Sequence, residues 1–161
     1  MEIRPATSSD DLTCVRELWR EYWDSFGLPL DFQGFGQELA NLPGAYGAEG
    51  GVILLAVEHY KGQDEPVGAI ALRRWDAVSG EVKRLYLRPQ FRGRGWGKRL
   101  LQAVIDRARA LGYQRLYADT LPVMTDALTL YERSGFERIP AYSEAPTPGA
   151  IYMKLELGSA A

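Results

Sequence analysis

The sequence predicts an α+β (α/β) fold, in which one β-sheet is covered by helices. Apolar residues recur at spacings of three and four near the N-terminus and follow β-type runs between residues 51 and 87. Afterwards helical and β-type segments alternate. The chain has 161 residues, of which 46% are hydrophobic and 25% charged. These values are typical of a globular protein that builds one core, so we expect a single domain spanning residues 1–161.

A short strand and a long amphipathic helix are expected at the N-terminus. The segment "EIRPA" fits the strand, and the "TSSDD" after it supplies caps and negative charge that favour a helix start. Gly27 and Pro29 are expected to end the helix. Residues 28–50 are expected to form a connecting segment between this helix and the following strands, with a short helical piece at 35–42. The apolar face of the long helix comprises Leu12, Val15, Leu18, Trp19, Tyr22, Trp23 and Phe26.

Three strands are expected between residues 51 and 87. "GVILLAVEHY" and "PVGAIALRRW" are joined by the polar "KGQDE", which indicates a hairpin, and "GEVKRLYL" is a further strand. In that strand Val82 has one parity whereas Leu85 and Leu87 have the other, so a regular strand cannot bury all three. We expect a β-bulge between Lys83 and Leu85. A bulge would leave backbone groups unpaired for an extended, amide-bearing ligand.

The C-terminal half is expected to alternate between helices and strands. Residues 94–113 form a helix, 114–120 a strand, 125–135 a second helix and 150–157 a last strand. If the helix at 94–113 is anchored to the core, its N-terminus is held rigidly. Its expected inward stripe comprises Leu100, Leu101, Val104, Ile105, Ala108 and Leu111.

The segment "RPQFRGRGWGKRLL" precedes this helix, and its residues 92–97 are called the glycine turn below. Arg92 and Arg99 stand where a P-loop needs Gly and Ser or Thr, and G-x-G-x-G is not a dinucleotide fingerprint. Glycines let the backbone approach a bulky anion, and the first helical amides have no internal partners. A phosphate-bearing ligand is therefore expected, with a plain turn and a solvated basic helix start as the alternative. The cations beside the turn are Arg92, Arg94, Lys98 and Arg99.

Phosphate at the turn and amides along the bulged strand together describe coenzyme A. Arg92, Gly95 and Gly97 match the motif Q/R-x-x-G-x-G/A, and the chain resembles the GNAT-type N-acetyltransferase superfamily over nearly its whole length. The resemblance implies a mixed, mostly antiparallel sheet, splayed between the strands at 81–87 and 114–119, and acetyl-CoA as the acyl donor. Met124 departs from the family, which commonly has Asn there. The implied donor-binding residues are Leu85, Tyr86, Leu87, Arg92, Gly93, Arg94, Gly95, Trp96, Gly97 and Lys98.

Amine acetylation needs a base, because an amine with a pKa near ~10.4 is almost fully protonated at pH 7. The resemblance implies Glu81 as that base, acting through water or with a pKa raised by burial, and Asp119 is the reserve. An exposed strand-end carboxylate is the structural alternative for Glu81. Tyr131 is implied as the acid that protonates the leaving thiol, although a buried core tyrosine also fits its pattern.

The expected function is acetyl transfer from acetyl-CoA directly to a primary amine of a small molecule or peptide. A non-catalytic acyl-CoA sensor or interaction module is the alternative. The candidate walls of the acceptor site are Trp19, Tyr22, Trp23, Phe26, Phe32, Phe35 and Tyr142, most of which also fit a core.

Composition and charge exclude several other classes of function. The net charge of -2 disfavours a nucleic-acid binder, and no apolar run reaches the ~18 residues of a membrane span. The single cysteine, Cys14, and the single histidine, His59, cannot supply a His/Cys metal site. The chain start lacks the layout of a signal peptide, so a cytoplasmic protein is expected. Family members are often dimers, which leaves a homodimer open.

Overall fold

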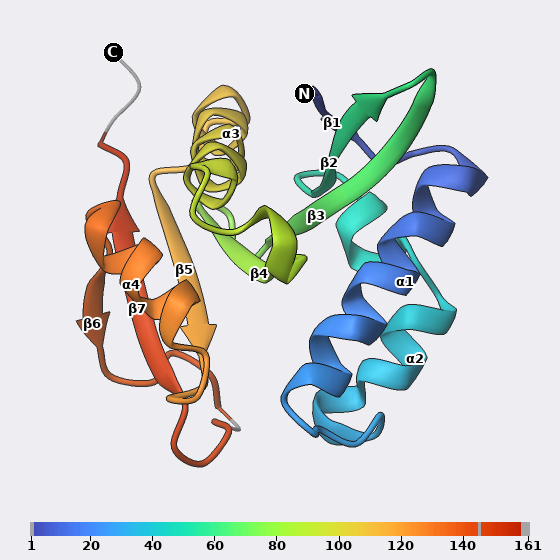
Figure 1. Cartoon of the computed structure of the whole chain (residues 1–161). Helices are drawn as coiled ribbons and strands as arrows, with labels where there is room; N and C mark the ends of the chain where they lie inside the picture. The colour runs from blue at the N-terminus through green and yellow to red at the C-terminus, as the bar shows by residue number, and fades with distance from the viewer. Residues whose placement is uncertain (1, 145, 159–161) are drawn as a thin grey trace.

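The computed structural model describes residues 2–144 and 146–158. In this part of the chain, seven strands form one sheet in the order β1-β2-β3-β4-β5-β7-β6 (Figure 1). The strands are β1 (Glu2–Pro5), β2 (Val52–Tyr60), β3 (Gln63–Arg74), β4 (Ser79–Leu87), β5 (Arg115–Thr120), β6 (Glu137–Ile139) and β7 (Ile151–Glu156). The helices are α1 (Ser9–Ser25), α2 (Phe35–Ala40), α3 (Trp96–Ala110) and α4 (Thr125–Arg133), with 3-10 turns at Phe32–Gly34, Gly44–Gly47 and Pro89–Phe91.

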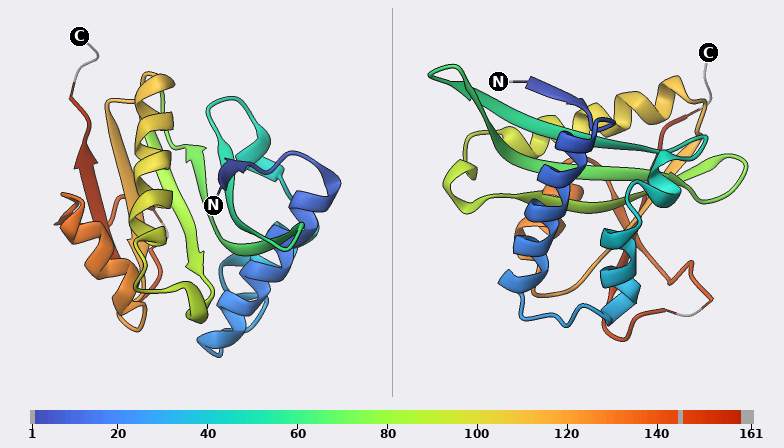
Figure 2. Two further views of the ribbon diagram at one scale, coloured as in Figure 1. Left: turned by 45° about the horizontal axis from the view of Figure 1, so that its top comes forward. Right: turned by 90° about the vertical axis from the view of Figure 1, so that its right-hand side faces the viewer.

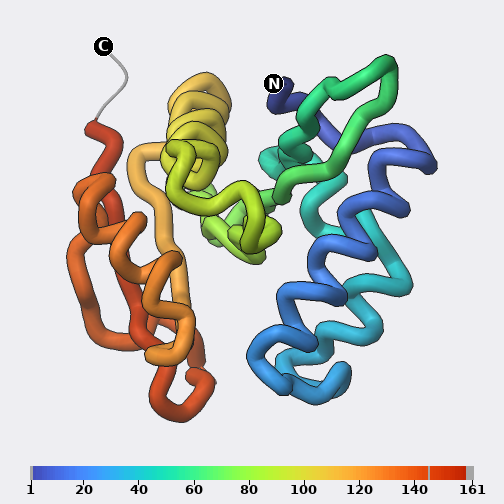
Figure 3. The backbone as a smooth tube through the Cα atoms, viewed as in Figure 1, coloured from blue at the N-terminus to red at the C-terminus, as the bar shows by residue number. Residues whose placement is uncertain are grey.

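The sheet is antiparallel except at its centre, where β4 and β5 run parallel. These two strands pair only from Ser79 and Arg115 to Val82 and Ala118, and then they separate. The expected mixed, mostly antiparallel and splayed sheet is therefore confirmed. The tube in Figure 3 shows the consequence: α1 and α2 face α4 and its neighbouring strands across the point of separation.

Two apolar clusters cover the two faces of the sheet. The first contains the inner stripe of α3 and the apolar residues of α4, and it includes Val82 and Leu85 of β4. The second contains the inner faces of α1 and α2, and it includes Tyr86 of β4. Figure 2 shows α3 on one side of strands β2 to β4, with α1 and α2 on the other. Neighbouring strand residues thus enter opposite clusters, as a period of two requires.

Helix α1 follows the sequence pattern closely. The Ser8 side chain accepts a hydrogen bond from the backbone N–H of Asp11, and Gly27 beyond the helix end has a φ of 65°. Leu12 and Phe26 are only partly buried at the two ends of the apolar face. The fully buried part of that face is Val15, Leu18, Trp19, Tyr22 and Trp23.

Helix α3 confirms the inward stripe except at its end. Leu100, Leu101, Val104, Ile105 and Ala108 are buried, but Leu111 is 40% exposed and its inclusion in the stripe was wrong. The helix ends at Ala110, so the helical period no longer applies at residue 111. Leu111 becomes the C-terminal cap and turns toward solvent.

The hairpin between β2 and β3 is tighter than the sequence suggests. Tyr60 pairs directly with Gln63, so the turn consists of Lys61 and Gly62 alone, at φ values of 50° and 76°. Two positive φ values in succession match the twist of a two-residue hairpin turn. The polar residues 63–65 are therefore strand, where a loop was expected. The three-residue edge strand β6 was also missed, because it is too short to show a period.

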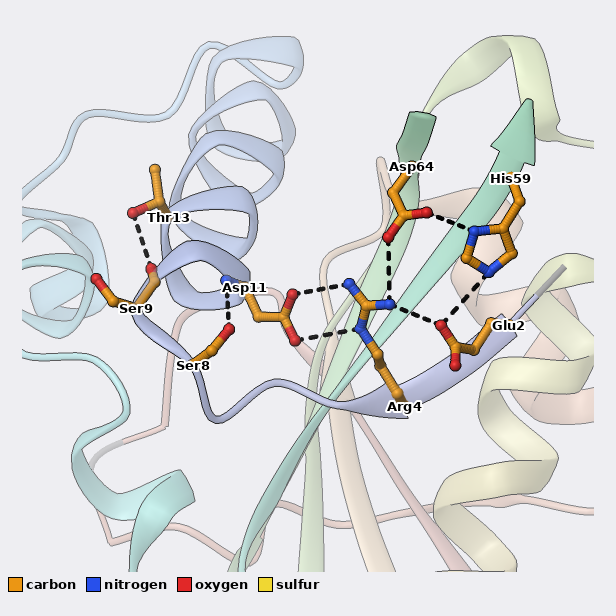
Figure 4. A network of polar contacts seen from close by, with 8 residues as sticks. All are labelled: Glu2, Arg4, Ser8, Ser9, Asp11, Thr13, His59 and Asp64. Atoms are coloured by element: carbon orange, nitrogen blue, oxygen red, sulfur yellow. Dashed lines mark hydrogen bonds and ion pairs between the residues drawn. The ribbon is translucent and has the colours of Figure 1, made fainter. Parts of the chain in front are cut away.

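A polar network joins β1, the start of α1 and the tip of this hairpin (Figure 4). Arg4 binds Asp11 at 2.9 Å, Glu2 at 2.6 Å and Asp64 at 3.4 Å. His59 contacts Asp64 and also approaches Glu2 at 3.5 Å. The Arg4 guanidinium thus connects β1, α1 and β3.

The bulge expected in β4 is present. Ala69 pairs with Tyr86 and Ala71 with Lys83, so two residues of β4 stand opposite one residue of β3. Arg84 occupies the bulge with a φ of 62°, which is rare outside glycine. The change of parity puts Leu85 under α3 together with Val82, and Leu87 packs against the same cluster.

Candidate functional site

A pocket of about 460 Å³ lies on the sheet face where β4 and β5 separate, and we call it the sheet pocket. Arg73 is paired with Glu81 and Ala71 with Lys83, so these residues share a face; Asp119 shares it because Tyr117 is paired with Glu81. The pocket floor is therefore charged. Its lining is Phe32, Gln33, Glu38, Arg73, Trp75, Glu81, Lys83, Arg84, Asp119, Tyr142, Ser143, Pro146, Thr147, Pro148 and Tyr152.

Glu81 lines this pocket with both carboxylate oxygens engaged. Its Oε1 accepts a hydrogen bond from Nε of Arg73 at 2.7 Å and forms an ion pair with Nη2 at 2.7 Å, and its Oε2 accepts a hydrogen bond from the Tyr142 hydroxyl at 2.6 Å. The residue is only 3% exposed. The alternative of an exposed strand-end carboxylate is therefore wrong. Burial and the negative charge of Glu81 raise the pKa of Tyr142 above its usual value of 10.0, so the hydroxyl remains a donor.

Asp119 stands across the separation from β4 and forms an ion pair with Lys83. The Lys83 ammonium lies 2.9 Å from Oδ1 of Asp119, and the two side chains are 10% and 15% exposed. This contact joins β4 and β5 beyond the last paired residues of the two strands. Asp119, the reserve base of the sequence analysis, lines the sheet pocket together with Glu81.

Arg84 holds the bulge to the α2 lobe. Its Nε and Nη2 donate to the two oxygens of Glu38 at 2.8 and 3.1 Å, and its guanidinium lies over the rings of Trp23 and Phe35. Burial has the largest single effect and would lower the pKa of Arg84, but the hydrogen bonds to Glu38 and the negative charge of Glu38 act together with smaller charge effects to raise that pKa. The unusual backbone of Arg84 is thus stabilised by a bidentate ion pair and by contact with two aromatic rings.

Tyr131 is placed differently from Glu81. It is 3% exposed and belongs to the cluster under α3, beside Phe136, and it does not line the sheet pocket. Burial raises the pKa of its hydroxyl, and the nearby charges of Asp119 and Glu81 raise it further. The proton of this hydroxyl is therefore firmly held at neutral pH.

The aromatic walls expected for an acceptor site divide into two groups. Phe32 and Tyr142 line the sheet pocket, whereas the other five pack in the core cluster under α1. Of these five, Trp19, Trp23 and Phe35 are fully buried, Tyr22 is 8% exposed and Phe26 is partly buried. Tyr142 stacks on Tyr117, and Trp75 meets Tyr142 edge-on at 5.0 Å.

Sequence reasoning missed Arg73, Trp75, Lys83 and Tyr152 as pocket residues. The alternation Ala69, Ala71, Arg73 was a usable signal, since it places a cation on one face after two small residues. Trp75 and Tyr152 gave no such signal, because only tertiary contacts bring them to the pocket.

The glycine turn leads into an uncapped helix. Gly93 and Gly95 have φ values of 78° and 82°, and space is open at both positions. Gly95 is the N-cap of α3 and has no side chain that could bind the first helical amides. Arg94, Gly95 and Lys98 are exposed, whereas the Trp96 side chain is buried. Trp96 therefore offers a ligand only its backbone.

Arg92 and Gly97 contribute to the structure of the turn itself. Arg92 Nε donates to the carbonyl of Leu87 at 3.1 Å, which closes the turn onto the end of β4. A methyl group at Gly97 would lie 3.2 Å from side-chain atoms of Leu87 and Leu130, so glycine allows α3 to pack closely there. Gly97 is thus required for packing, whereas Gly93 and Gly95 are required for backbone conformation.

The bulged strand runs from the sheet pocket to the glycine turn. Leu85 and Leu87 face the α3 side and Tyr86 the α1 side, and residues 83–87 have lost β5 as a partner. Backbone groups on that edge are available to an extended ligand.

Met124, the departure from the family pattern, is buried opposite Tyr22. The Tyr22 hydroxyl donates to the Met124 sulfur at 3.0 Å and thereby links α1 to the segment before α4. Burial raises the pKa of Tyr22 to about 12. A thioether is a weak acceptor, so the packing of two buried side chains contributes more here than the hydrogen bond.

Searches for metal and membrane features within residues 2–144 and 146–158 give two negative findings. The acidic, His and Cys side chains form no group of three or more that could bind a metal ion. No helix in this range is both long and apolar enough to span a bilayer.

Comparisons with known proteins identify the family. The profile of the acetyltransferase (GNAT) family matches residues 15–136. An uncharacterized N-acetyltransferase of Schizosaccharomyces pombe is 34% identical over 148 residues, which cover 91% of this chain and 89% of that protein. The chain belongs to the GNAT acetyltransferase family. It is therefore an acyltransferase of the GNAT type.

Solved GNAT structures share its fold. An acetyltransferase of the family from Staphylococcus aureus superposes with a TM-score of 0.82 at 22% identity, covering 97% of this chain and 99% of that one. An aminoglycoside 6'-N-acetyltransferase complexed with coenzyme A has a TM-score of 0.73 at 17% identity, covering 98% and 97%. The splayed sheet is thus the GNAT architecture.

Proposed function

We propose that this GNAT protein transfers an acetyl group from acetyl-CoA directly to a primary amine of a small molecule or peptide. The observation that carries the proposal is the separation of β4 from β5 between the glycine turn and the carboxylates of the sheet pocket. A donor bound along β4 would bring its thioester to Glu81 and Asp119. The coenzyme A complex of a protein with the same fold supports this choice of donor.

The residues of the glycine turn suit a pyrophosphate. The uncapped amides of α3, the open positions at Gly93 and Gly95, and the exposed cations Arg94 and Lys98 all lie within residues 93–98 or at the start of the helix. The pantetheine amides would pair with the free edge of β4 at Leu85 to Leu87. In this arrangement acetyl-CoA is a substrate, and it supplies the activated acyl group.

Glu81 would take the proton that the ammonium form of the acceptor must lose. Because both of its oxygens already accept hydrogen bonds, the proton would travel through a water molecule, with Asp119 as the alternative acceptor. The amine nitrogen then attacks the thioester carbonyl, a C–N bond forms and the C–S bond breaks. The leaving sulfur takes a proton from the Tyr131 hydroxyl, whose raised pKa keeps it protonated until then. Solvent reprotonates Tyr131 after Glu81 releases its proton.

The purified protein should release free thiol from acetyl-CoA only when a suitable amine is present, and mass spectrometry should detect the acetylated amine. A panel of amino acids, polyamines, aminoglycosides and peptides covers the candidate acceptors. Tight acetyl-CoA binding without thiol release from any amine would contradict an enzymatic role and favour the non-catalytic acyl-CoA sensor.

Replacing Glu81 with Gln should lower kcat/KM by about 10²- to 10⁴-fold, because the general base is removed while the shape of the side chain is kept. The loss should be greatest at low pH, where the acceptor amine is most protonated. Stopped assays at several pH values measure it, and calorimetry should give an unchanged affinity for acetyl-CoA. A larger loss in Asp119→Asn than in Glu81→Gln would assign the base to Asp119 instead.

A further inference from the structure

We propose that Arg73 and Lys83 bind a carboxylate of the acceptor, which makes the acceptor a free α-amino acid. The inference rests on the proposed function and narrows its substrate class. It excludes peptide N-termini and polyamines as preferred acceptors, because neither carries a carboxylate next to the reacting amine.

The two cations border one small space on the floor of the sheet pocket. Arg73 stands opposite Glu81, and Lys83 stands opposite Ala71 one position further along the same face. Diagonal neighbours of this kind are roughly 7–8 Å apart at the backbone, within reach of long side chains. The diagonal between the two cations is flanked by the small side chain of Ala71 on β3 and by Glu81 on β4. We place the ligand carboxylate above Ala71.

Both cations have hydrogen-bond donors left over. An arginine has five N–H donors and a lysine ammonium three, but among the described residues Arg73 contacts Glu81 through Nε and Nη2 only and Lys83 donates once, to Asp119. The Lys83 side chain is only 10% exposed, so little water can satisfy the rest. Buried donors without acceptors are unfavourable. A ligand carboxylate supplies the acceptors that the described pocket residues lack.

The pocket also has a place for the amine. Oδ1 of Asp119 accepts from Lys83, and Oδ2 has no partner among the described residues. An ammonium group at Oδ2 would lie near a carboxylate bound by Lys83, because the Lys83 ammonium is 2.9 Å from Oδ1 of the same aspartate. Because two cations already balance Glu81 and Asp119, a zwitterion leaves no uncompensated charge.

The rim of the pocket suits an apolar side chain on that amino acid. Trp75 is 36% exposed and packs edge-on against Tyr142, and Phe32 also lines the pocket. A rigid aromatic surface of this kind binds aliphatic and aromatic groups.

Matched acceptors test the inference directly. Phenylalanine, phenylalaninamide and phenethylamine share a side chain, and only the first has a carboxylate; leucine with its amide and amine forms a second set. After correction for the fraction of neutral amine, kcat/KM should be about 10- to 100-fold higher for the amino acids. Equal values within both sets would overturn the inference and leave the proposed function intact. Acetylation of no member of either set would also overturn the inference, whereas the wider amine panel tests the proposed function separately.

Two conservative variants test the residues. Arg73→Lys keeps a cation for Glu81 but loses the guanidinium fork, and Lys83→Gln keeps a donor for Asp119 but loses the charge. Each should raise KM for the amino acid about tenfold or more relative to KM for its amide, because only the acid loses a carboxylate contact. Arg74→Lys is the matched control, because Arg74 is next in β3 and lies against Tyr113 on the opposite face. Equal changes for acid and amide would refute the subsite.

Calorimetry with phenylalanine or leucine, in the presence of coenzyme A, tests the subsite without turnover. Binding by the unaltered protein that weakens in Arg73→Lys and Lys83→Gln, but not in Arg74→Lys, supports the inference. Absence of binding by the unaltered protein, or equal weakening in all three variants, contradicts it.

Discussion

The glycines of the glycine turn have different structural roles, although they belong to one sequence motif. Gly93 and Gly95 adopt φ values near 80° beside open space, whereas Gly97 lies within van der Waals reach of Leu87 and Leu130. Positive φ is easy only for glycine, and close packing needs the absence of a side chain. The conformational and the packing roles can therefore be separated by substitution.

Gly95→Trp should weaken acetyl-CoA binding at least about tenfold, because a large side chain would cover the amides of the first turn of α3. Gly112→Trp is the matched control. Gly112 follows the other end of α3, has a φ of 86° and also faces open space, so both variants carry the same backbone strain. Isothermal calorimetry measures both affinities. Equal weakening in the two variants would remove the glycine turn from the donor site.

At the scale of elements, the bulge in β4 positions the site. It changes the parity of the strand, brings Leu85 under α3 and leaves Arg84 at a φ of 62°. The ion pair with Glu38 then joins this bulge to α2 across the sheet pocket. Strand β4, which separates from β5, is thus held by α2, a helix far away in the sequence.

Arg84→Gly should be more stable than Arg84→Ala by about 1 kcal/mol, because alanine at positive φ is strained and glycine is not. Both variants lose the ion pair with Glu38, so the comparison isolates the backbone. The order is the reverse of that in an ordinary strand, where alanine is preferred. Urea unfolding of the two variants measures the difference. Alanine as stable as glycine would mean that the bulge is absent.

The polar network at the tip of the β2–β3 hairpin should make the stability of the fold depend on pH. The hydrogen bond from His59 lowers the pKa of Asp64 below its usual value of 3.8, against a small effect of burial. The folded state therefore favours the carboxylate, and this stabilisation is present above pH 3.8 and is lost as the pH falls further.

Asp64→Asn should lower Tm slightly at pH 7 and have no effect once the pH is well below 3.8. Glu65→Gln is the control, because it removes the same charge from the next residue of β3. Thermal unfolding followed by circular dichroism at several pH values measures both. A difference in Tm that persists unchanged into acid would contradict the role given to the Asp64 carboxylate.

At the scale of the whole molecule, one helix supports both halves of the sheet. Residues of α3 pack in one cluster with β2, β3 and β4 and with Tyr131 and Phe136 from the C-terminal half. The N-terminus of the same helix presents the glycine turn, so the stability of the core and the rigidity of the expected anion site depend on the same packing.

Leu100→Ala should destabilise the fold by about 2–5 kcal/mol, because the side chain is fully buried and its removal leaves a cavity. Leu111→Ala makes the same chemical change just after the end of α3, at a residue that is 40% exposed. It should cost less than about 1 kcal/mol. Chemical denaturation compares the two. Similar losses would show that Leu111 belongs to the stripe after all.

Much of the fold could be predicted because local patterns specify it. The stripe of α1, the β runs of the hairpin and the parity conflict in β4 each depend on a period that the sequence displays. The errors fall where no period exists: the two-residue turn at Lys61, the short β6 and the end of α3 at Leu111.

The sequence by itself determined the longer helices and strands, the bulge and the glycine turn, since these follow from the spacing of apolar residues and from glycine. Only the tertiary structure decided the partners of the candidate site. Arg73, Tyr142 and Glu81 come from three strands or loops, and Lys83 meets Asp119 from 36 residues away. Side-chain contacts between distant segments are set by how the sheet twists and separates, and no local pattern records them.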